Sequence, residues 1–331
     1  MSKYQNGKDN GERIWVGVDI GGTKTGIVLC TEVPDVLARI EFPTLPALGP
    51  ERAVEIIKKT IHELIAAQGV APGHLQAIGV SCGGPLDRNS GVIQAPPNLS
   101  TWVNVPIASI LQNEFGVHCM LENDANAGAV AEHRFGAGKG TKHMVFLTMG
   151  TGMGAGIIAN GQLYHGASDS AGEIGHVRMT RSGPIGHNKA GSVEGWVSGG
   201  GLATVATQAV GVAIRNGKPT TLTSQFHEGT LSAKDVAFAA HQGDELAVRI
   251  LESTGIRLGK TLAVLVDILN PERIVIGGLA MRLGEMLLGP ARVAMRREAL
   301  RSSVDHCQVV PSALGEKIGD ISAFCVARGM L

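Results

Sequence analysis

The sequence predicts an α/β protein of two domains whose halves repeat one unit, each beginning with a β-hairpin. Its 331 residues, 44% of them hydrophobic, are enough for two domains that each bury a core. Two β-rich stretches, at 14–30 and 144–164, each fold back at a turn that contains glycine and threonine. Helical and strand patterns alternate through the rest of the chain, which is typical of α/β folds. We expect an active cleft between the two halves.

The first half is predicted from turn residues and from apolar periodicity. The stretches IWVGVDI and KTGIVLC are β-rich, and Gly21-Gly22-Thr23 between them suits a tight hairpin turn. Val54, Ile57 and Ile61 recur every three or four residues, which indicates an amphipathic helix. In order, we expect strands at 14–20 and 24–30, a helix at 51–68, a strand at 77–81, a helix at 106–115 and a strand at 117–121.

The second half begins with a similar hairpin. A glycine-rich turn at 150–154 separates MVFLTM from AGII, and Asn160-Gly161 provides the next turn. One long helical pattern stops at Asn270-Pro271, because proline disfavours a helical conformation in the residue before it. In order, we expect strands at 144–149, 155–158 and 162–164, a helix at 245–269, a strand at 273–277 and a helix that opens at Gly277-Gly278.

These elements set the expected domain boundaries. Residues 1–13 are polar and contain glycine, so we expect a disordered tail there. The N-terminal α/β domain is predicted at 14–122 and is joined by a C-terminal helix at 312–331. The larger C-terminal α/β domain is predicted at 123–311.

Composition and charge argue against several functions. Lys and Arg total 29, as do Asp and Glu, so the formal net charge is 0 and broad binding to nucleic acid or to anionic membranes is disfavoured. No stretch has the roughly 20 apolar residues of a membrane helix, and no apolar segment near the N-terminus is typical of a secretion signal. The five cysteines are scattered without a C-x-x-C pair, which favours the reducing cytoplasm.

The two glycine-threonine turns are candidate phosphate sites. In the first, Gly21 and Gly22 lack side chains, so backbone N–H groups and the Thr23 hydroxyl can reach phosphate oxygens, and Asp19 can hold Mg²⁺ through water. A strand follows each turn, whereas a Walker P-loop or a dinucleotide-binding fingerprint would run into a helix. Either segment alone is more often only a turn, but two such turns that face each other can clamp a triphosphate.

Two groups of polar residues are candidate substrate ligands. Asn123 and Asp124 precede an alanine-rich helix, where either can be an ordinary N-cap. In the functional interpretation, Asp124 accepts a proton from an alcohol that attacks a γ-phosphate, and Asn123 orients a sugar hydroxyl. Glu173, His176 and Glu194 lie in a glycine-rich stretch and suit several hydroxyls of one small polar ligand. The alternative is a solvated polar loop or a salt-bridged His176.

Together, in this order and over nearly the whole chain, these motifs resemble the ROK family of sugar kinases and related repressors, within the actin-like ATPase superfamily. The resemblance implies the two-domain actin-like ATPase fold, which is ribonuclease H-like. It rests on seven segments: VGVDIGGTKTGIVL, IGVSCGGPLD with the following SGVI, PPNLSTWVNVPI, LENDANAGAVAEHRFGAG, VFLTMGTGMGAGIIANGQL, AGEIGH and LNPERIVIGGL.

The resemblance also implies roles for single residues, with ATP and Mg²⁺ as cofactors. Asp124 matches the catalytic base. The ATP-binding positions are matched by Asp19, Gly21, Gly22, Thr23 and Lys24 in the first phosphate motif, Thr151 and Gly152 in the second, and Gly277 and Gly278 at the adenosine. The sugar-binding positions are matched by Gly84, Asn123, Asp124, Glu173, His176 and Glu194.

The sequence departs from the family in two places. Members typically carry C-x-C-G-x-x-G-C-x-E after the histidine, with three cysteines that bind a structural zinc, whereas this chain has GHNKAGSVE. His176 and His187 alone cannot supply the four N or S ligands of such a site, so we predict no zinc and expect packing around Trp196 to fix the loop. The family's repressors carry a DNA-binding winged helix before the first phosphate motif. Only residues 1–13 precede that motif here, so no winged helix is expected.

From these observations we expect a cytoplasmic, ATP-dependent hexose kinase with glucose as its first substrate. Fructose, mannose and N-acetylated hexosamines stay open as substrates. A non-catalytic sugar-sensing protein of the same fold is a second alternative, and an ATPase or phosphatase of the wider superfamily is a third. The expected partners are a hexose and ATP, with neither nucleic acid nor membrane, and the resemblance implies a homo-oligomer, either a dimer or a tetramer.

Overall fold

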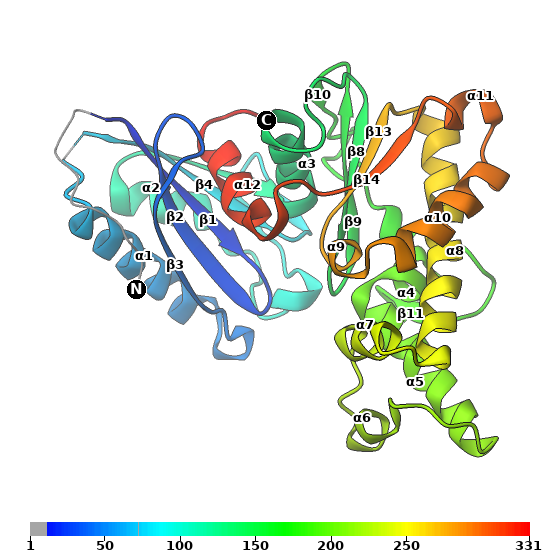
Figure 1. Cartoon of the computed structure of the whole chain (residues 1–331). Helices are drawn as coiled ribbons and strands as arrows, with labels where there is room; N and C mark the ends of the chain where they lie inside the picture. The colour runs from blue at the N-terminus through cyan, green and yellow to red at the C-terminus, as the bar shows by residue number, and fades with distance from the viewer. Residues whose placement is uncertain (1–11, 72) are drawn as a thin grey trace. The chain divides into compact units, whose positions relative to one another are not determined.

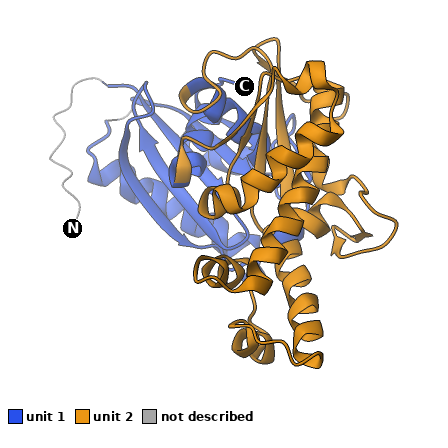
Figure 2. Ribbon diagram, turned by 45° about the vertical axis from the view of Figure 1, so that its right-hand side comes forward, with its two compact units in different colours: residues 1–134, 316–331 blue, residues 135–315 orange. Residues whose placement is uncertain are grey.

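The computed structural model describes residues 12–71 and 73–331. Most of the predicted tail, 1–13, therefore lies outside the described residues. The chain divides into two compact units, with residues 1–134 and 316–331 in unit 1 and residues 135–315 in unit 2 (Figure 2). The first boundary falls after Arg134, whereas the sequence predicts it after Glu122. The C-terminal helix α12 (Ile318–Ala327) belongs to unit 1.

Unit 1 is built on a five-stranded sheet (Figure 1). In spatial order its strands are β3 (Val36–Pro43), β2 (Lys24–Cys30), β1 (Ile14–Ile20), β4 (Leu75–Cys82) and β7 (His118–Asn123). The first three run antiparallel, and β1, β4 and β7 run parallel. Asp19 lies beside Ser81, and Ser81 beside Glu122, so the three form one row near the carboxyl ends of the parallel strands.

Helices cover this sheet because its strands are apolar. Ile57 and Ile61 of α1 (Pro50–Ala67) and Leu111 of α2 (Ile107–Phe115) are fully buried in one core with the strands. Helix α12 packs on β1 and β4. Glycine permits this close approach, since a Cβ atom at Gly79 would clash with the backbone of Ala327.

Unit 2 repeats the sheet of unit 1. Its strands lie in the order β10 (Gln162–Leu163), β9 (Met153–Ala159), β8 (Met144–Met149), β13 (Arg273–Ile276) and β14 (Gln308–Pro311). The first three are antiparallel, and β8, β13 and β14 are parallel. Strand order and direction match those of unit 1, which confirms that two hairpin-containing halves repeat one unit.

The longest helix of unit 2, α8 (Glu245–Leu269), agrees with the prediction residue for residue and ends at Asn270, whose φ of 45° is left-handed. Helix α10 (Glu285–Glu298) packs closely along it. A Cβ atom at Gly255 would lie 2.6 Å from the Leu287 carbonyl oxygen, and one at Gly259 would clash with that of Ala291. Two glycines four residues apart therefore bring these helix backbones together.

The remaining helices and strands complete the two units. They are β5 (Leu86–Asp87), β6 (Val92–Ile93), α3 (Asp124–Phe135), β11 (Ile185–Gly186), β12 (Lys189–Ala190), α4 (Val193–Val197), α5 (Gly199–Arg215), α6 (Thr223–Glu228), α7 (Ala233–His241), α9 (Leu279–Leu283) and α11 (Arg301–Val304). All five cysteines are buried free thiols. Within the described ranges, no helix combines the length and the apolar character needed to cross a membrane.

Candidate active site

The first glycine-threonine turn joins β1 to β2 in unit 1. It closes through a hydrogen bond from Gly21 N to Lys24 O of 3.0 Å. The buried Thr44 braces it, because its hydroxyl donates to Gly21 O at 2.7 Å and its N–H donates to Thr23 O at 3.1 Å. A Cβ atom at Gly22 would lie only 2.5 Å from Asn98 Cβ, so glycine is required there. The turn is thus held in one backbone shape.

Asp19 lies at the carboxyl end of β1, just before this turn. The N-terminus of α12 abuts it, since a Cβ atom at Gly319 would clash with Asp19 Oδ2. Burial, and next the negative charge of Asp124, raise the pKa of Asp19 to about 7. The first half of the predicted site therefore brings two carboxylates within electrostatic reach of each other.

Lys24 is engaged by a chain of ion pairs. Its Nζ lies 2.8 Å from Glu41 Oε2, and Arg39 Nη2 lies 2.6 Å from the same oxygen. Arg39 Nε also binds Asp320 Oδ2 of α12 at 2.8 Å. This chain ties the start of β2 to β3 and to α12.

Asn123 and Asp124 stand where β7 passes into α3. Asn123 Oδ1 accepts hydrogen bonds from Ala125 N at 2.9 Å and from Asn126 N at 3.3 Å, so Asn123 caps the helix. Asp124 Oδ1 accepts from Ala125 N at 2.7 Å, and its side chain is exposed between the buried Glu122 and Ala125. The cap interpretation therefore holds for Asn123, while Asp124 offers a carboxylate to the outside. A Cβ atom at Gly84 would lie 3.3 Å from Asn123 Nδ2, which places Gly84 beside this pair.

The second turn joins β8 to β9 in unit 2. Gly150 N donates to Gly152 O at 3.1 Å. The start of α5 backs the turn, because Gly199 N donates to Gly150 O at 2.8 Å and Gly200 N to Thr151 O at 3.2 Å. Thr151 is exposed. The turn therefore rests on a helix N-terminus.

Glu173 directly precedes the short 3₁₀ helix Ile174–His176 and His176 ends it, and both residues are exposed. Their segment lies against β9, where Ala155 N donates to Gly172 O at 2.8 Å. Glu194, on α4, reaches the same strand, since its Oε2 accepts from Met153 N at 3.1 Å. The three predicted sugar ligands of unit 2 are thus gathered around β9.

A small hairpin stands at the position of the family's cysteine-rich loop. It pairs β11 with β12, and its turn residues His187 and Asn188 have left-handed φ values of 46° and 59°. Ser192 Oγ donates to Gly186 O at 3.2 Å and accepts from Gly195 N at 3.1 Å. Lys189 Nζ donates to His176 O at 2.8 Å. Hydrogen bonds therefore tie this hairpin both to His176 and to α4.

Trp196 is held on the far side of the same loop. Its Nε1 donates to Thr180 Oγ1 at 2.7 Å, and the guanidinium carbon of Arg257 lies 4.0 Å from the centre of its ring. A Cβ atom at Gly183 would clash with the indole. Residues 12–71 and 73–331 hold no group of three or more His, Cys, Asp or Glu side chains that could bind a metal ion.

Gly277 and Gly278 end β13 beside the second turn. Gly278 has a left-handed φ of 68°, and a Cβ atom there would clash with the carbonyl oxygen of Met149, which directly precedes the turn. Gly277 N donates to Leu147 O at 2.9 Å. Close packing of backbone on backbone thus places both glycines next to Gly150–Gly152.

The predicted residues fall into two groups, one in each unit. Unit 1 holds the first turn, the junction of β7 with α3, and Gly84 beside that junction. Its predicted members are Asp19, Gly21, Gly22, Thr23, Lys24, Gly84, Asn123 and Asp124. Unit 2 brings together the second turn, the β9 ligands and the end of β13. Its predicted members are Thr151, Gly152, Glu173, His176, Glu194, Gly277 and Gly278.

Sequence reasoning missed four residues that shape the unit 1 group: Thr44 and Asn98 at the turn, and Glu122 with Arg88 behind Asp124. Glu122 carried a signal, as a carboxylate within an apolar strand directly before Asn123. Asn98 lies in the segment PPNL, which the resemblance includes. Thr44 and Arg88 stand in loops without a pattern of their own.

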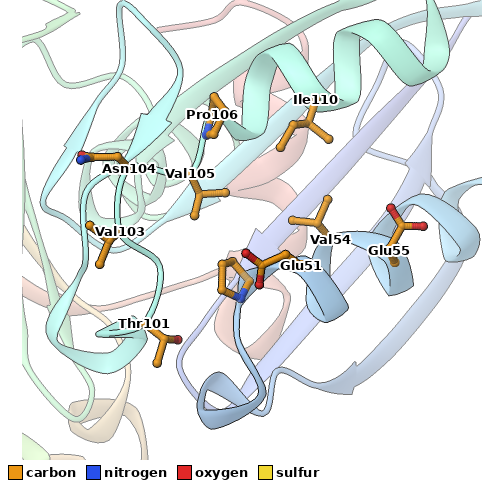
Figure 3. A pocket seen from close by; sticks show the side chains of 10 residues that line it. Glu51, Val54, Glu55, Thr101, Val103, Asn104, Val105, Pro106 and Ile110 are labelled. Atoms are coloured by element: carbon orange, nitrogen blue, oxygen red, sulfur yellow. The ribbon is translucent and has the colours of Figure 1, made fainter.

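A hollow of about 380 Å³ opens elsewhere on unit 1, between the start of α1 and the loop before α2 (Figure 3). It is lined by Pro50, Glu51, Val54, Glu55, Thr101, Val103, Asn104, Val105, Pro106 and Ile110. None of these is a predicted site residue, so the hollow is separate from the groups described above.

Known proteins match this chain over almost its full length. A model of the ROK family matches residues 15–329. A glucokinase of Halalkalibacterium halodurans is 33% identical over 312 residues, which cover 94% of this chain and 93% of that protein. The xylose repressor of Bacillus subtilis is 25% identical over 301 residues, covering 91% of this chain and 73% of the repressor.

Among solved structures, a ROK family glucokinase from Streptomyces griseus in complex with glucose and AMPPNP matches with a TM-score of 0.79. It is 31% identical, and the match covers 96% of this chain and 99% of that one. The fold is accordingly the two-domain actin-like ATPase fold of the ROK sugar kinases. The chain belongs to the ROK family.

Proposed function

We propose that this protein transfers the γ-phosphoryl group of ATP to a hydroxyl of a hexose, with glucose as the first candidate. The glucokinase of Halalkalibacterium halodurans and the Streptomyces griseus enzyme with glucose and AMPPNP support this choice. Fructose, mannose and N-acetylated hexosamines are the alternative substrates, because hydroxyl ligands such as Glu173, His176 and Glu194 suit all of these sugars.

The observation that carries the proposal is the position of Asp124. Its exposed carboxylate stands in the first turn of α3, where the helix dipole favours the ionised form. An ionised carboxylate at this point can take the proton of a sugar hydroxyl as that oxygen attacks phosphorus. Phosphoryl transfer has a loose transition state, so the main task of the protein is to position the reactants and to stabilise charge.

The residues of unit 1 fit a nucleotide with a divalent cation. Asp124 lies near enough to Asp19 for its charge to raise the pKa of Asp19, and a cation held through water by Asp19 would relieve that repulsion. When bound, Mg²⁺ neutralises charge on the β- and γ-phosphates. The braced turns at Gly21–Thr23 and Gly150–Gly152 are the groups proposed to present backbone to phosphate oxygens. Gly277 and Gly278, packed beside the second turn, are the residues proposed to contact adenosine.

In this proposal the sugar ligands are Asn123 of unit 1 and Glu173, His176 and Glu194 of unit 2. Asn123 uses its oxygen to cap α3, so its amide nitrogen, beside Gly84, is the group left to donate to a sugar hydroxyl. Glu173 and Glu194 accept from hydroxyls, and His176 can donate or accept.

The test is ADP release with Mg·ATP and a panel of glucose, mannose, fructose, N-acetylglucosamine, N-acetylmannosamine and no sugar. We expect turnover with a hexose and background release without one. Asp124→Ala should abolish turnover while sugar affinity stays within about tenfold, because the base acts mainly in the transition state. Glu63→Ala, which removes an exposed carboxylate on α1, is the control. Undiminished turnover in Asp124→Ala would refute the mechanism, and equal ADP release without sugar would indicate an ATPase.

A second candidate is a sugar-responsive protein with little catalysis. The observation that favours it is the 25% identity with the xylose repressor of Bacillus subtilis over 91% of this chain. In the same panel, this candidate predicts sugar binding by calorimetry without ADP release for any sugar.

A further inference from the structure

Glu194 makes a contact that its expected role as a sugar ligand does not require. Its Oε2 accepts a hydrogen bond of 3.1 Å from Met153 N, the residue that directly follows the second phosphate turn. A Cβ atom at Gly152 would lie 2.7 Å from the same oxygen. The carboxylate therefore lies in direct contact with the end of the turn.

Helix α5, which follows Glu194 in the chain, holds the beginning of the same turn. Ser198 N donates to Glu194 O at 3.1 Å and joins α4 to α5. The next two amides, of Gly199 and Gly200, donate to the carbonyl oxygens of Gly150 and Thr151 at 2.8 and 3.2 Å. The bonds from Gly199 and Gly200 join backbone to backbone. The bond from Met153 N to Glu194 Oε2 is therefore the contact with this turn that uses a side chain and a carboxylate.

Unit 1 has a similar arrangement at its own turn. There a Cβ atom at Gly22 would lie 2.5 Å from Asn98 Cβ, just as one at Gly152 would meet Glu194. In each unit the second glycine of the phosphate turn thus faces a polar side chain from another segment. The contact in unit 2 differs because its side chain is a charged acceptor with a second oxygen, Oε1.

We propose that Glu194 is a positioning residue for ATP, and that it links the sugar to the second phosphate turn. This inference rests on the proposed kinase function. Oε2 fixes Met153 and hence Gly150–Gly152, and Oε1 accepts from a sugar hydroxyl. A sugar hydroxyl bound to Oε1 immobilises the Glu194 carboxylate and, through Oε2, the second phosphate turn. Because ATP then has less of this turn to order, the bound sugar raises the affinity for ATP.

The experiment measures equilibrium binding of AMPPNP with Mg²⁺ in the absence of sugar. Hydrogen bonds to charged groups contribute more than neutral ones, so Glu194→Ala should weaken binding about tenfold. Glu194→Gln keeps an acceptor of the same reach but loses the charge, so it should weaken binding about threefold, less than Glu194→Ala. Glu194→Asp keeps the charge but is shorter by one methylene, so it should resemble Glu194→Ala. Thermal unfolding of each variant checks that it is folded.

His176→Gln is the matched control, because it keeps the backbone carbonyl that Lys189 Nζ binds and changes a ring whose centroid lies 5.6 Å from that of His187. It should weaken sugar binding and leave AMPPNP binding unchanged. With the sugar that supports turnover present, AMPPNP should bind the unmodified protein several-fold more tightly and Glu194→Ala no more tightly than before.

Two results would overturn the inference. If Glu194→Ala and Glu194→Asp bind AMPPNP like the unmodified protein, Glu194 does not position the turn, and the kinase proposal still stands. If the unmodified protein binds no AMPPNP at all, the kinase proposal fails together with this one.

Discussion

Arg88 donates from Nε to Oε2 of Glu122 at 3.1 Å and so pairs a carboxylate that is 1% exposed. The other oxygen of Glu122 accepts from Asn126 Nδ2 at 3.0 Å and from Asn123 N at 2.9 Å. One buried carboxylate therefore joins the loop after β5, the end of β7 and the first turn of α3. Asp124 lies in the sequence between Asn123 and Asn126, both of which Glu122 binds.

Glu122→Gln should lower both stability and turnover. The substitution removes the negative charge that Arg88 Nε contacts, and the free energy of unfolding should fall by about 2 kcal/mol. Because Asp124 then loses its rigid support, kcat should fall about tenfold with little change in the KM for ATP. Denaturant titration and steady-state kinetics measure both effects. Glu55→Gln, on the exposed face of α1, should change neither, and an unchanged kcat in Glu122→Gln would mean that the network is only structural.

The raised pKa of Asp19 should make the stability of the protein depend on pH. Its pKa is raised from 3.8 to about 7 by burial and by Asp124, so the folded state retains a proton that the unfolded chain releases. The stabilisation is present in full below about pH 4 and is lost as the pH rises towards 7. Asp19→Asn mimics the protonated group and should therefore be more stable than the unmodified protein at pH 8, by about 4 kcal/mol, and equally stable at pH 4.

Differential unfolding of the two proteins from pH 4 to pH 8 measures this effect, with the exposed Asp305→Asn as control. The same Asp19→Asn variant should have lost Mg·ATP-dependent turnover, because it lacks the carboxylate proposed to hold Mg²⁺. A constant stability difference across the pH range would show that Asp19 does not titrate as inferred.

Local patterns explain why some elements could be predicted to the residue. Gly21-Gly22-Thr23 marks the turn between β1 and β2, and Asn270-Pro271 marks the end of α8. In both places the turn or helix-ending residues agree with the apolar periodicity of the flanking segments. Helix α5 was missed because it begins with three glycines, which are poor helix formers. It forms because Ser198 Oγ accepts from Gly201 N at 3.0 Å and because Leu202 and Val210 are buried.

The edge strand β3 was missed for a related reason. Most of its residues alternate between partly buried and exposed, so its apolar pattern is weak. The strand forms because its backbone pairs with β2, and a local sequence pattern does not show this pairing.

The candidate site could be predicted only as far as its motifs are contiguous. Asn123-Asp124 and Gly21-Gly22-Thr23 could be recognised because their polar side chains and turn-forming residues are adjacent in the sequence. The bond between Arg88 and Glu122 joins residues 34 positions apart, and the bond between Met153 and Glu194 joins residues 41 apart. Such contacts depend on how the sheets bring segments together, and no local pattern encodes them.

The crossing of α8 and α10 offers a test of the packing in unit 2. Gly259→Ala would push a methyl group into the carbonyl of Ala291, and because backbone cannot give way locally, the helices must separate. We expect a loss of about 2 kcal/mol in the free energy of unfolding, measured by denaturant titration. Gly289→Ala in α10 is the matched control, since its Cβ would approach only the Glu285 side chain, at 3.7 Å. It should be neutral or slightly stabilising, because alanine is the better helix former. Equal stabilities of the two variants would contradict the close crossing.

We expect the hairpin of β11 and β12 to hold the segment around His176 in place, as zinc is expected to do in relatives with the cysteine motif. Lys189 Nζ donates to His176 O at 2.8 Å, and Lys189→Met removes this bond while keeping the aliphatic stem. The KM for the sugar should rise about threefold, since an exposed hydrogen bond contributes about 0.5–1 kcal/mol, while kcat and the KM for ATP stay constant. Lys218→Met, an exposed lysine on the loop after α5, should change none of these constants.

The same view of the loop predicts how the protein responds to chelators. Because hydrogen bonds and Trp196 packing hold the segment, a zinc-selective chelator in the presence of excess Mg²⁺ should change neither the melting temperature nor the KM for the sugar. Treatment with the chelator is followed by differential scanning calorimetry and by the hexose panel, with a ROK kinase that carries the cysteine motif treated in parallel. A fall in melting temperature that added Zn²⁺ restores would mean that His176 and His187, whose ring centroids lie 5.6 Å apart, take part in a metal site after all. An unchanged melting temperature together with a raised sugar KM in Lys189→Met would assign the anchoring of His176 to the hairpin.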